Sequence, residues 1–148
     1  PLVHADSPTV PGVREEFDHS VYALVGYLMQ HLQSPNPPDA LMAVSDGHTF
    51  SIHSACRLCG IDPARDLTVV GYDNYYYQVK ERAFEPLLPA ATVDKNNEAL
   101  GYSLVELLQS RIGMPMEATP QLRLVPHRLV EIETHEATEM RHRVLMES

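Results

Sequence analysis

Polar residues follow three apolar runs of the sequence, and they are the first candidates for chemistry. The pairs are Asp6-Ser7, Ser45-Asp46 and Asp73-Asn74. Carboxylates and amides supply acceptors and donors that suit hydroxyl groups or ring N–H groups. A phosphate would instead favour bare backbone N–H groups with Lys or Arg nearby. The residue types therefore favour a neutral polyol, a sugar or a nucleobase as ligand.

These residues also have a structural interpretation. Asp46 suits the N-cap of a following helix, and Asp73-Asn74 suits a turn. Three consecutive tyrosines, Tyr75 to Tyr77, come next. Such rings stack on sugars or bases, and more commonly they pack against a partner chain or lobe. From the residues alone, both interpretations stay open.

The elements that must position these residues form a strand–helix–strand pattern over residues 38–74. Two apolar runs, Ala40–Val44 and Leu67–Tyr72, enclose a helical segment that ends at Gly60. Parallel strands place their carboxyl ends at one edge of a sheet, where ligands bind in open α/β folds. We therefore expect an α/β fold with a parallel sheet and the polar pairs along its carboxyl edge.

The flanking sequence predicts more elements of the same kind. Apolar residues at helical spacing predict a helix from about Glu15 to Leu32 and a second helix over residues 96–112. Asp94, Asn96 or Asn97 caps the second helix. Pro86 and Pro89 argue against regular structure in the long connection before it. Short strands are expected at residues 2–5, 91–93, 122–125 and 129–132.

Length and charge limit the partners. The 148 residues suffice for one domain with a core, and the first is not Met, which suggests a fragment or a processed chain. Formal net charge is -9, from 11 Lys+Arg against 20 Asp+Glu. Clustered basic residues, which nucleic acid or an anionic membrane would require, are missing. No apolar run approaches the ~20 residues of a membrane span. We expect no membrane contact and no DNA binding by this chain alone.

Signatures of catalysis and of metal binding are weak. The sequence contains no GxGxxG, Walker loop, HExxH or GxSxG motif. Cys56 and Cys59 fall at the C-terminal end of the expected helix, where the helix dipole does not activate a thiol, and one CxxC is half of a zinc site. His48 and His53 do not share a helix face well. We expect buried structural cysteines, no metal, no cofactor and no catalytic residues, so the chain is not expected to be an enzyme.

One stretch carries a family resemblance. Residues 38–74, PDALMAVSDGHTFSIHSACRLCGIDPARDLTVVGYDN, resemble the C-terminal part of the ligand-binding domain of LacI/GalR (lac-repressor-type) transcription regulators. Ala91-Thr92-Val93, the helix that contains Glu98 to Gly101, and Leu129-Val130-Glu131 resemble later motifs of that family. Two features depart from its pattern. Gly47-His48-Thr49 replaces the usual apolar helix start, and the connection from Tyr75 to Pro89 is long.

The resemblance implies a periplasmic-binding-protein-like type I fold, a three-layer αβα arrangement. Residues 1–133 would form mainly its C-terminal lobe, and residues 134–148 a polar tail. The helix at 96–112 would belong to the other lobe of a full-length protein. We therefore expect its apolar face either to repack on this lobe or to pair with another chain.

The resemblance also implies the function of a cytoplasmic transcription regulator. The chain would bind a small effector, a sugar, polyol or nucleobase-like molecule, and form a homodimer or higher oligomer. DNA would be bound only through a helix-turn-helix head outside this chain. The implied effector contacts are Asp46, Asp6 and Asp73, with Asn74 and Tyr75 beside them. Alternatives are a solute-binding protein of a sugar ABC importer and a ligand-sensing module fused to another output domain.

Overall fold

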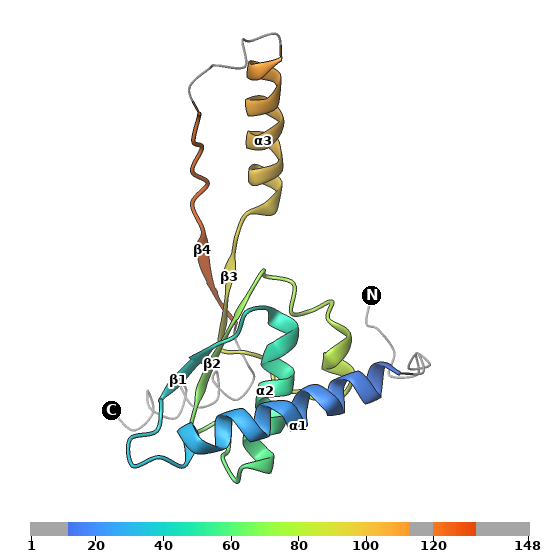
Figure 1. The fold of residues 1–148 in the computed structure, drawn as a ribbon, viewed down its shortest axis with the longest axis vertical. Coiled ribbons are helices and arrows are strands. Elements are labelled where there is room, and N and C mark those ends of the chain that lie inside the picture. Colours follow the sequence, from blue (N-terminus) through green and yellow to red (C-terminus); the bar gives the residue numbers. More distant parts are fainter. Residues whose placement is uncertain (1–11, 113–119, 133–148) are drawn as a thin grey trace, which may run out of the picture.

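The computed structural model describes residues 12–112 and 120–132 (Figure 1). In chain order, its elements are α1 (Val13–Leu32), β1 (Ala40–Met42), α2 (Asp46–Leu58), β2 (Thr68–Tyr72), the 3-10 helix η1 (Lys80–Ala83), β3 (Ala91–Asp94), α3 (Asn97–Arg111) and β4 (Arg128–Glu131). The strand expected at residues 2–5 and the polar tail at 134–148 lie outside the described residues. The proposed boundary between residues 133 and 134 therefore stays a prediction.

The four strands form one sheet in the order β1-β2-β3-β4. The first three are parallel, with Leu41 opposite Val69 and Gly71 opposite Thr92. The last strand runs antiparallel to β3 and places Arg128 opposite Asp94. The predicted α/β class is confirmed, and the parallel part of the sheet brings the carboxyl ends of β2 and β3 to the same edge.

The core lies between α1, α2 and one face of the sheet. The predicted face of α1 is buried, and it joins Phe50 and Cys56 of α2 and Val69 of β2 in one apolar cluster. The residues of α1 that are buried there are Phe17, Val21, Leu28 and Leu32. Cys56 and Cys59 are both free and buried, as predicted. This packing fixes α2, and with it the residues at the helix start.

Helix caps agree with the sequence in two of three cases. Gly60 ends α2 with φ 78, and the Ile61 N–H donates to the Cys56 carbonyl at 2.9 Å, the pattern of a Schellman motif. Asn96 caps α3 and accepts a hydrogen bond from the Ala99 N–H at 3.3 Å. The expected N-cap role of Asp46 is wrong, because Ser45 is the N-cap and Asp46 is the first helical residue. The Asp46 carboxylate therefore does not cap α2, and it forms hydrogen bonds with other segments of the chain.

Helix α3 projects away from the rest of the molecule (Figure 1). We call α3 together with residues 120–127 the arm, and the remaining described elements the body. None of the α3 residues is buried, and Leu108 and Ile112 are 63% and 72% exposed. The expectation that this helix could repack on the lobe is wrong. Its pairing with another chain stays a prediction.

Residues 122–125 do not form the predicted strand. They run extended beside α3, and Leu122 and Leu124 are largely exposed. An apolar pattern alone cannot make a strand, because a strand also needs a neighbour for its backbone hydrogen bonds. The strand that does form, β4, begins at Arg128, where β3 supplies that neighbour.

Candidate functional site

The Asp46 carboxylate is fully buried at the start of α2. Its Oδ2 accepts backbone hydrogen bonds from Tyr75 at 2.6 Å and from Tyr76 at 2.9 Å. Its Oδ1 accepts a bond from the Thr92 hydroxyl at 2.6 Å. A buried carboxylate needs such donors, because it loses the hydration that stabilised its charge. Asp46 therefore fixes the backbone of the loop that follows β2.

Gly71 of β2 makes room for this carboxylate. A Cβ built on Gly71 would overlap Oδ1 of Asp46 and would lie 3.3 Å from the Thr49 methyl group. Residue 71 thus faces α2 at the point where Asp46 leaves the helix. Only glycine leaves enough space there for Asp46 to reach Thr92.

The loop after β2 has an unusual backbone. Asp73 and Asn74 both have positive φ, at 102 and 57, a conformation that Asn and Asp tolerate better than most residues. The Asp73 N–H donates to the Val93 carbonyl at 2.9 Å, and the Asn74 N–H donates to the Thr92 hydroxyl at 3.2 Å. We call residues 73–76 the edge loop. The prediction that Asp73-Asn74 makes a turn at the strand end is confirmed.

Two ion pairs close the same edge. Lys95 Nζ contacts Asp73 Oδ1, and Lys95 lies 5.4 Å from the centre of the Tyr72 ring. Arg128 contacts Asp94 Oδ2 at 3.2 Å. The pairing with Asp73 raises the pKa of Lys95, and the Asn96 N–H, with help from Arg128, lowers the pKa of Asp94. The carboxylates at this edge are thus largely matched by cations.

Aromatic rings give the edge an apolar component. Tyr75 is 38% exposed and Tyr77 is 55% exposed, so both rings are accessible. Tyr76 and Tyr77 meet edge to face at 5.6 Å, and Tyr72 meets His127 in the same way at 6.1 Å. Rings beside amides and carboxylates are suited to a flat or ring-shaped polar ligand.

The histidines do not form a metal centre. His48 is exposed, and its Nδ1 lies 2.8 Å from the Ser45 hydroxyl, whereas His53 is buried on the other side of α2. Within residues 12–112 and 120–132, no group of three or more His, Cys, Asp or Glu residues could hold a metal ion. A Ser–His contact without a further orienting group is a local helix-start contact.

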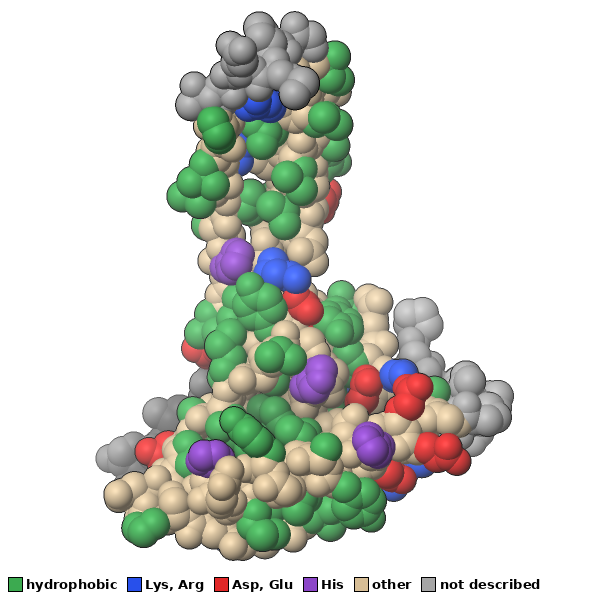
Figure 2. All heavy atoms as spheres, in the orientation of Figure 1, with side chains coloured by type: hydrophobic (Ala, Val, Ile, Leu, Met, Phe, Trp, Pro, Cys, Tyr) green, Lys and Arg blue, Asp and Glu red, His purple; other side chains and the backbone are tan. Residues whose placement is uncertain are grey.

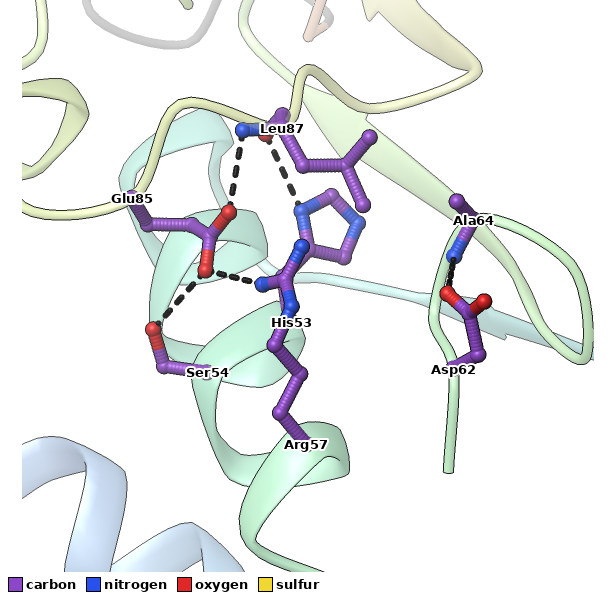
Figure 3. Close-up of polar contacts among 7 residues, drawn as sticks. All are labelled: His53, Ser54, Arg57, Asp62, Ala64, Glu85 and Leu87. Carbon is purple, nitrogen blue, oxygen red and sulfur yellow. Dashed lines mark hydrogen bonds and ion pairs between the residues drawn. The ribbon is translucent and has the colours of Figure 1, made fainter. Parts of the chain in front are cut away.

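A second polar cluster was missed by the sequence analysis. Glu85 is buried and accepts bonds from Ser54 at 3.1 Å, from Arg57 and from the Leu87 N–H (Figure 3). His53 Nδ1 lies 3.1 Å from the Leu87 carbonyl, and burial lowers the pKa of His53. These contacts fasten the long connection after η1 to α2. Three polar residues close together in α2, at positions 53, 54 and 57, were a signal in the sequence. Their partners, Glu85 and Leu87, lie far along the chain, so the sequence alone did not indicate the cluster.

The structure thus brings four of the five predicted site residues together. Asp46, Asp73, Asn74 and Tyr75 meet at the carboxyl edge of the sheet, joined through β3. Asp6 lies outside the described residues. Thr92, Lys95 and Gly71 were not predicted, although each lies against at least one of the four.

Comparison with known proteins identifies the family. A family model for a periplasmic binding protein-like domain matches residues 2–134. The chain belongs to this family. No curated protein sequence gives a significant match.

Solved structures support the same assignment. A protein assigned as the transcriptional regulator LacI of Bacillus cereus subsp. cytotoxis is 29% identical, with TM-score 0.56, and the match covers 80% of this chain and 40% of that one. The lac repressor dimer bound to operator and the anti-inducer ONPF is 25% identical, with TM-score 0.52, and the match covers 72% of this chain and 30% of that one. An uncharacterised protein from Actinobacillus succinogenes is 25% identical, with TM-score 0.54, and the match covers 75% of this chain and 38% of that one.

These matches confirm the resemblance to lac-repressor-type regulators and the periplasmic-binding-protein-like fold. The chain spans well under half the length of each of these three relatives. In the described part of the chain, no helix combines the length and the apolar character that crossing a membrane requires.

Proposed function

We propose that this periplasmic binding protein-like chain is the effector-binding and dimerisation part of a cytoplasmic LacI-type transcription regulator, without enzymatic activity. The family match and the likeness to two LacI-type regulators support this proposal. The observation that carries it is the edge loop, which Asp46 and Thr92 hold in a defined shape at the carboxyl edge of the sheet.

The proposed effector is a small neutral molecule, such as a sugar, a polyol or a nucleobase. The charges at the edge are already paired, Asp73 with Lys95 and Asp94 with Arg128, so an ionic ligand would have to displace a partner. A neutral ligand can instead bond to the remaining lone pairs and amides. We assign direct contacts to Asp73, Asn74 and Tyr75, and the contact expected for Asp6 stays a prediction, because Asp6 lies outside the described residues.

Asp46 has a particular role in this proposal. Its two oxygens already accept three hydrogen bonds, so any direct contact with the effector would use the remaining lone pair on Oδ1. Its larger contribution is to hold the edge loop ready for the ligand. Preformed loops bind more tightly, because less conformational entropy is lost on binding.

The full-length protein would couple effector binding to DNA through two states of the domain. An effector that prefers one state shifts the population toward it, by no more than its difference in affinity for the two states. DNA contact would come from a helix-turn-helix head outside this chain, since the net charge here is -9. Pairing of the arm with a second copy would support the dimer.

Isothermal titration calorimetry on the full-length protein tests this function, with a panel of sugars, polyols and purines. We expect one class to bind, and Asn74→Ala or Tyr75→Ala to weaken its binding at least tenfold. Tyr22→Ala is the matched control, because Tyr22 is an exposed tyrosine on α1, away from the edge loop. Failure of every neutral ligand, with an anion binding instead, would overturn the effector assignment.

A second candidate is a solute-binding protein of a sugar importer, which the periplasmic binding protein-like family match also favours. The sequence upstream of this chain separates the two. A helix-turn-helix segment there supports the regulator, and a secretion signal supports the solute-binding protein. A ligand-sensing module fused to another output domain would show neither.

A further inference from the structure

The end of β3 contacts the edge loop through four consecutive residues. The Thr92 hydroxyl accepts the Asn74 N–H at 3.2 Å, and the Val93 carbonyl accepts the Asp73 N–H at 2.9 Å. The Asn74 side chain helps to lower the pKa of the Asp94 carboxyl, and Lys95 pairs with the Asp73 carboxylate. Asp73 and Asn74 are therefore held along their whole length by the strand that leads into the arm.

Lys95 is the last of these four residues and the first beyond the sheet. Asn96 follows with φ 54 and caps α3, so the chain turns sharply into the arm directly after Lys95. Helix α3 itself has no buried residue, and Figure 2 shows apolar side chains on the surface of the arm. Contacts at the junction must therefore set the angle between arm and body.

The pair between Lys95 and Asp73 is partly shielded from water. The Lys95 side chain is 31% exposed and that of Asp73 is 23% exposed, so water screens this pair less than it screens the surface pairs of the body. The Tyr72 ring lies 5.4 Å from Nζ, close enough for a cation–π contact. Asp73 pairs with the ammonium while its own backbone has a positive φ of 102. The pair thus joins the backbone state of the edge loop to the position of the arm.

We propose that Lys95 is a positioning residue, whose pairing with Asp73 latches the arm to the edge loop and makes the two move as one. When the arm turns, Lys95 must either carry Asp73 with it or release it. A change in the edge loop, in turn, alters the hold on the arm. That this latch transmits effector binding rests on the proposed function. The latch itself is a property of the chain without ligand.

Pulsed electron–electron double resonance, which measures the distance between two spin labels, tests the latch on the 148-residue chain. Spin labels at Ala23→Cys on α1 and Gln109→Cys on α3 report the distance between body and arm, and both positions are exposed. With Lys95 intact, we expect one narrow distance distribution. Lys95→Met keeps the apolar stem but loses the cation, and it should lose the narrow distribution. Lys95→Arg should retain it.

Two further variants are a control within the body, Lys80→Met, and a change to the other partner of the pair, Asp73→Asn. Lys80→Met removes the 2.8 Å pair with Glu16, which lies within the body, and should leave the distribution unchanged. Asp73→Asn tolerates the positive φ, removes the charge and should broaden the distribution as Lys95→Met does, with no further loss in the double variant.

If Lys95→Met does not fold, the distance distribution of Asp73→Asn tests the latch in its place. Unchanged distributions in these variants, or equal broadening in Lys80→Met, would overturn the latch. Failure to bind any effector would overturn the proposed function and leave this result intact.

Discussion

The Thr92 hydroxyl donates a 2.6 Å hydrogen bond to Oδ1 of Asp46, although the two residues are 46 positions apart in the chain. Both side chains are fully buried. The bond joins the start of α2 to the middle of β3, and the other carboxylate oxygen holds the edge loop. One buried carboxylate therefore ties together three segments of the candidate site.

We expect Asp46→Asn to lower the free energy of unfolding by about 2–3 kcal/mol. The change removes the charge that strengthens the two backbone bonds from Tyr75 and Tyr76, and its N–H₂ group can no longer accept the proton of the Thr92 hydroxyl, which must turn. Thr92→Val should cost about 1–2 kcal/mol, since it leaves one carboxylate lone pair of Asp46 and the Asn74 N–H without their partner. Urea denaturation of the two single variants and the double variant measures the coupling. Strictly additive losses would contradict a direct bond.

Asp18→Asn is the control for this series. Asp18 pairs with Arg14 at 2.9 Å on the surface of α1, and exposed pairs of this kind contribute little. Its denaturation midpoint should match that of the unmodified chain. A loss equal to that of Asp46→Asn would show that removing any carboxylate destabilises this acidic protein.

Two glycine substitutions should have opposite effects. Gly71→Ala should cost about 2–3 kcal/mol, because the added methyl group overlaps Asp46 and displaces it. Gly26→Ala should stabilise by about 0.5–1 kcal/mol, since Gly26 lies within α1 and its Cβ would meet open space. Thermal or urea unfolding of both variants checks the contrast. A neutral Gly71→Ala would mean that Asp46 can move without loss.

Stability should fall as the pH drops below about 6.5. Burial lowers the pKa of His53 below its ordinary 6.5, while the Leu87 carbonyl and Glu85 oppose the shift and Arg57 adds to it. Between the two pKa values the unfolded chain binds a proton that the folded chain does not, so protons favour unfolding there. Above the unfolded pKa this effect vanishes.

The measurement for His53 is the free energy of unfolding at several pH values between 5 and 8. His53→Gln can still donate to the Leu87 carbonyl but does not titrate, so its profile should be flat over the upper part of this range. His19→Gln, an exposed histidine on α1, is the control and should keep the slope. The same slope in His53→Gln would assign the effect to other groups.

The Cys56 thiol should react slowly. Burial, with the neighbouring Cys59, raises the pKa of Cys56 to about 11, so almost no thiolate is present near neutral pH. In native buffer, a thiol reagent should modify Cys56 only as fast as the chain opens. Mass spectrometry at increasing denaturant gives the rate at each site. Rapid modification of the native chain would show that α2 opens readily.

The sequence located the candidate site but not its internal bonds. Asp46, Asp73 and Asn74 were predicted to gather because parallel strands end together, and they do. Thr92 was treated as an ordinary strand residue, because nothing in a short apolar run tells which face a threonine hydroxyl will take. Only the register, with Gly71 opposite Thr92, places that hydroxyl beside Asp46.

Contacts between distant segments account for the other differences. His53 and Glu85 are joined through Leu87, and neither segment alone indicates the other. Leu122 and Leu124 have the alternation of a strand, yet they lie beside a helix and have no strand partner among the described residues. Helix α3 has the spacing of a packed helix, yet none of its residues is buried in the part of the chain that the structure describes.

The antiparallel pairing of β4 with β3 means that the chain leaves the body and returns to it at adjacent points, Asp94 and Arg128. Residues 95–127 are therefore the connection between the two strands of one β-hairpin. Loop-closure entropy grows only slowly with length, so the sheet should tolerate very different connections at this place. Replacing residues 95–127 by a tight Asn-Gly turn should leave a body that folds alone. The body would then be a self-sufficient unit, and the arm an insertion within it.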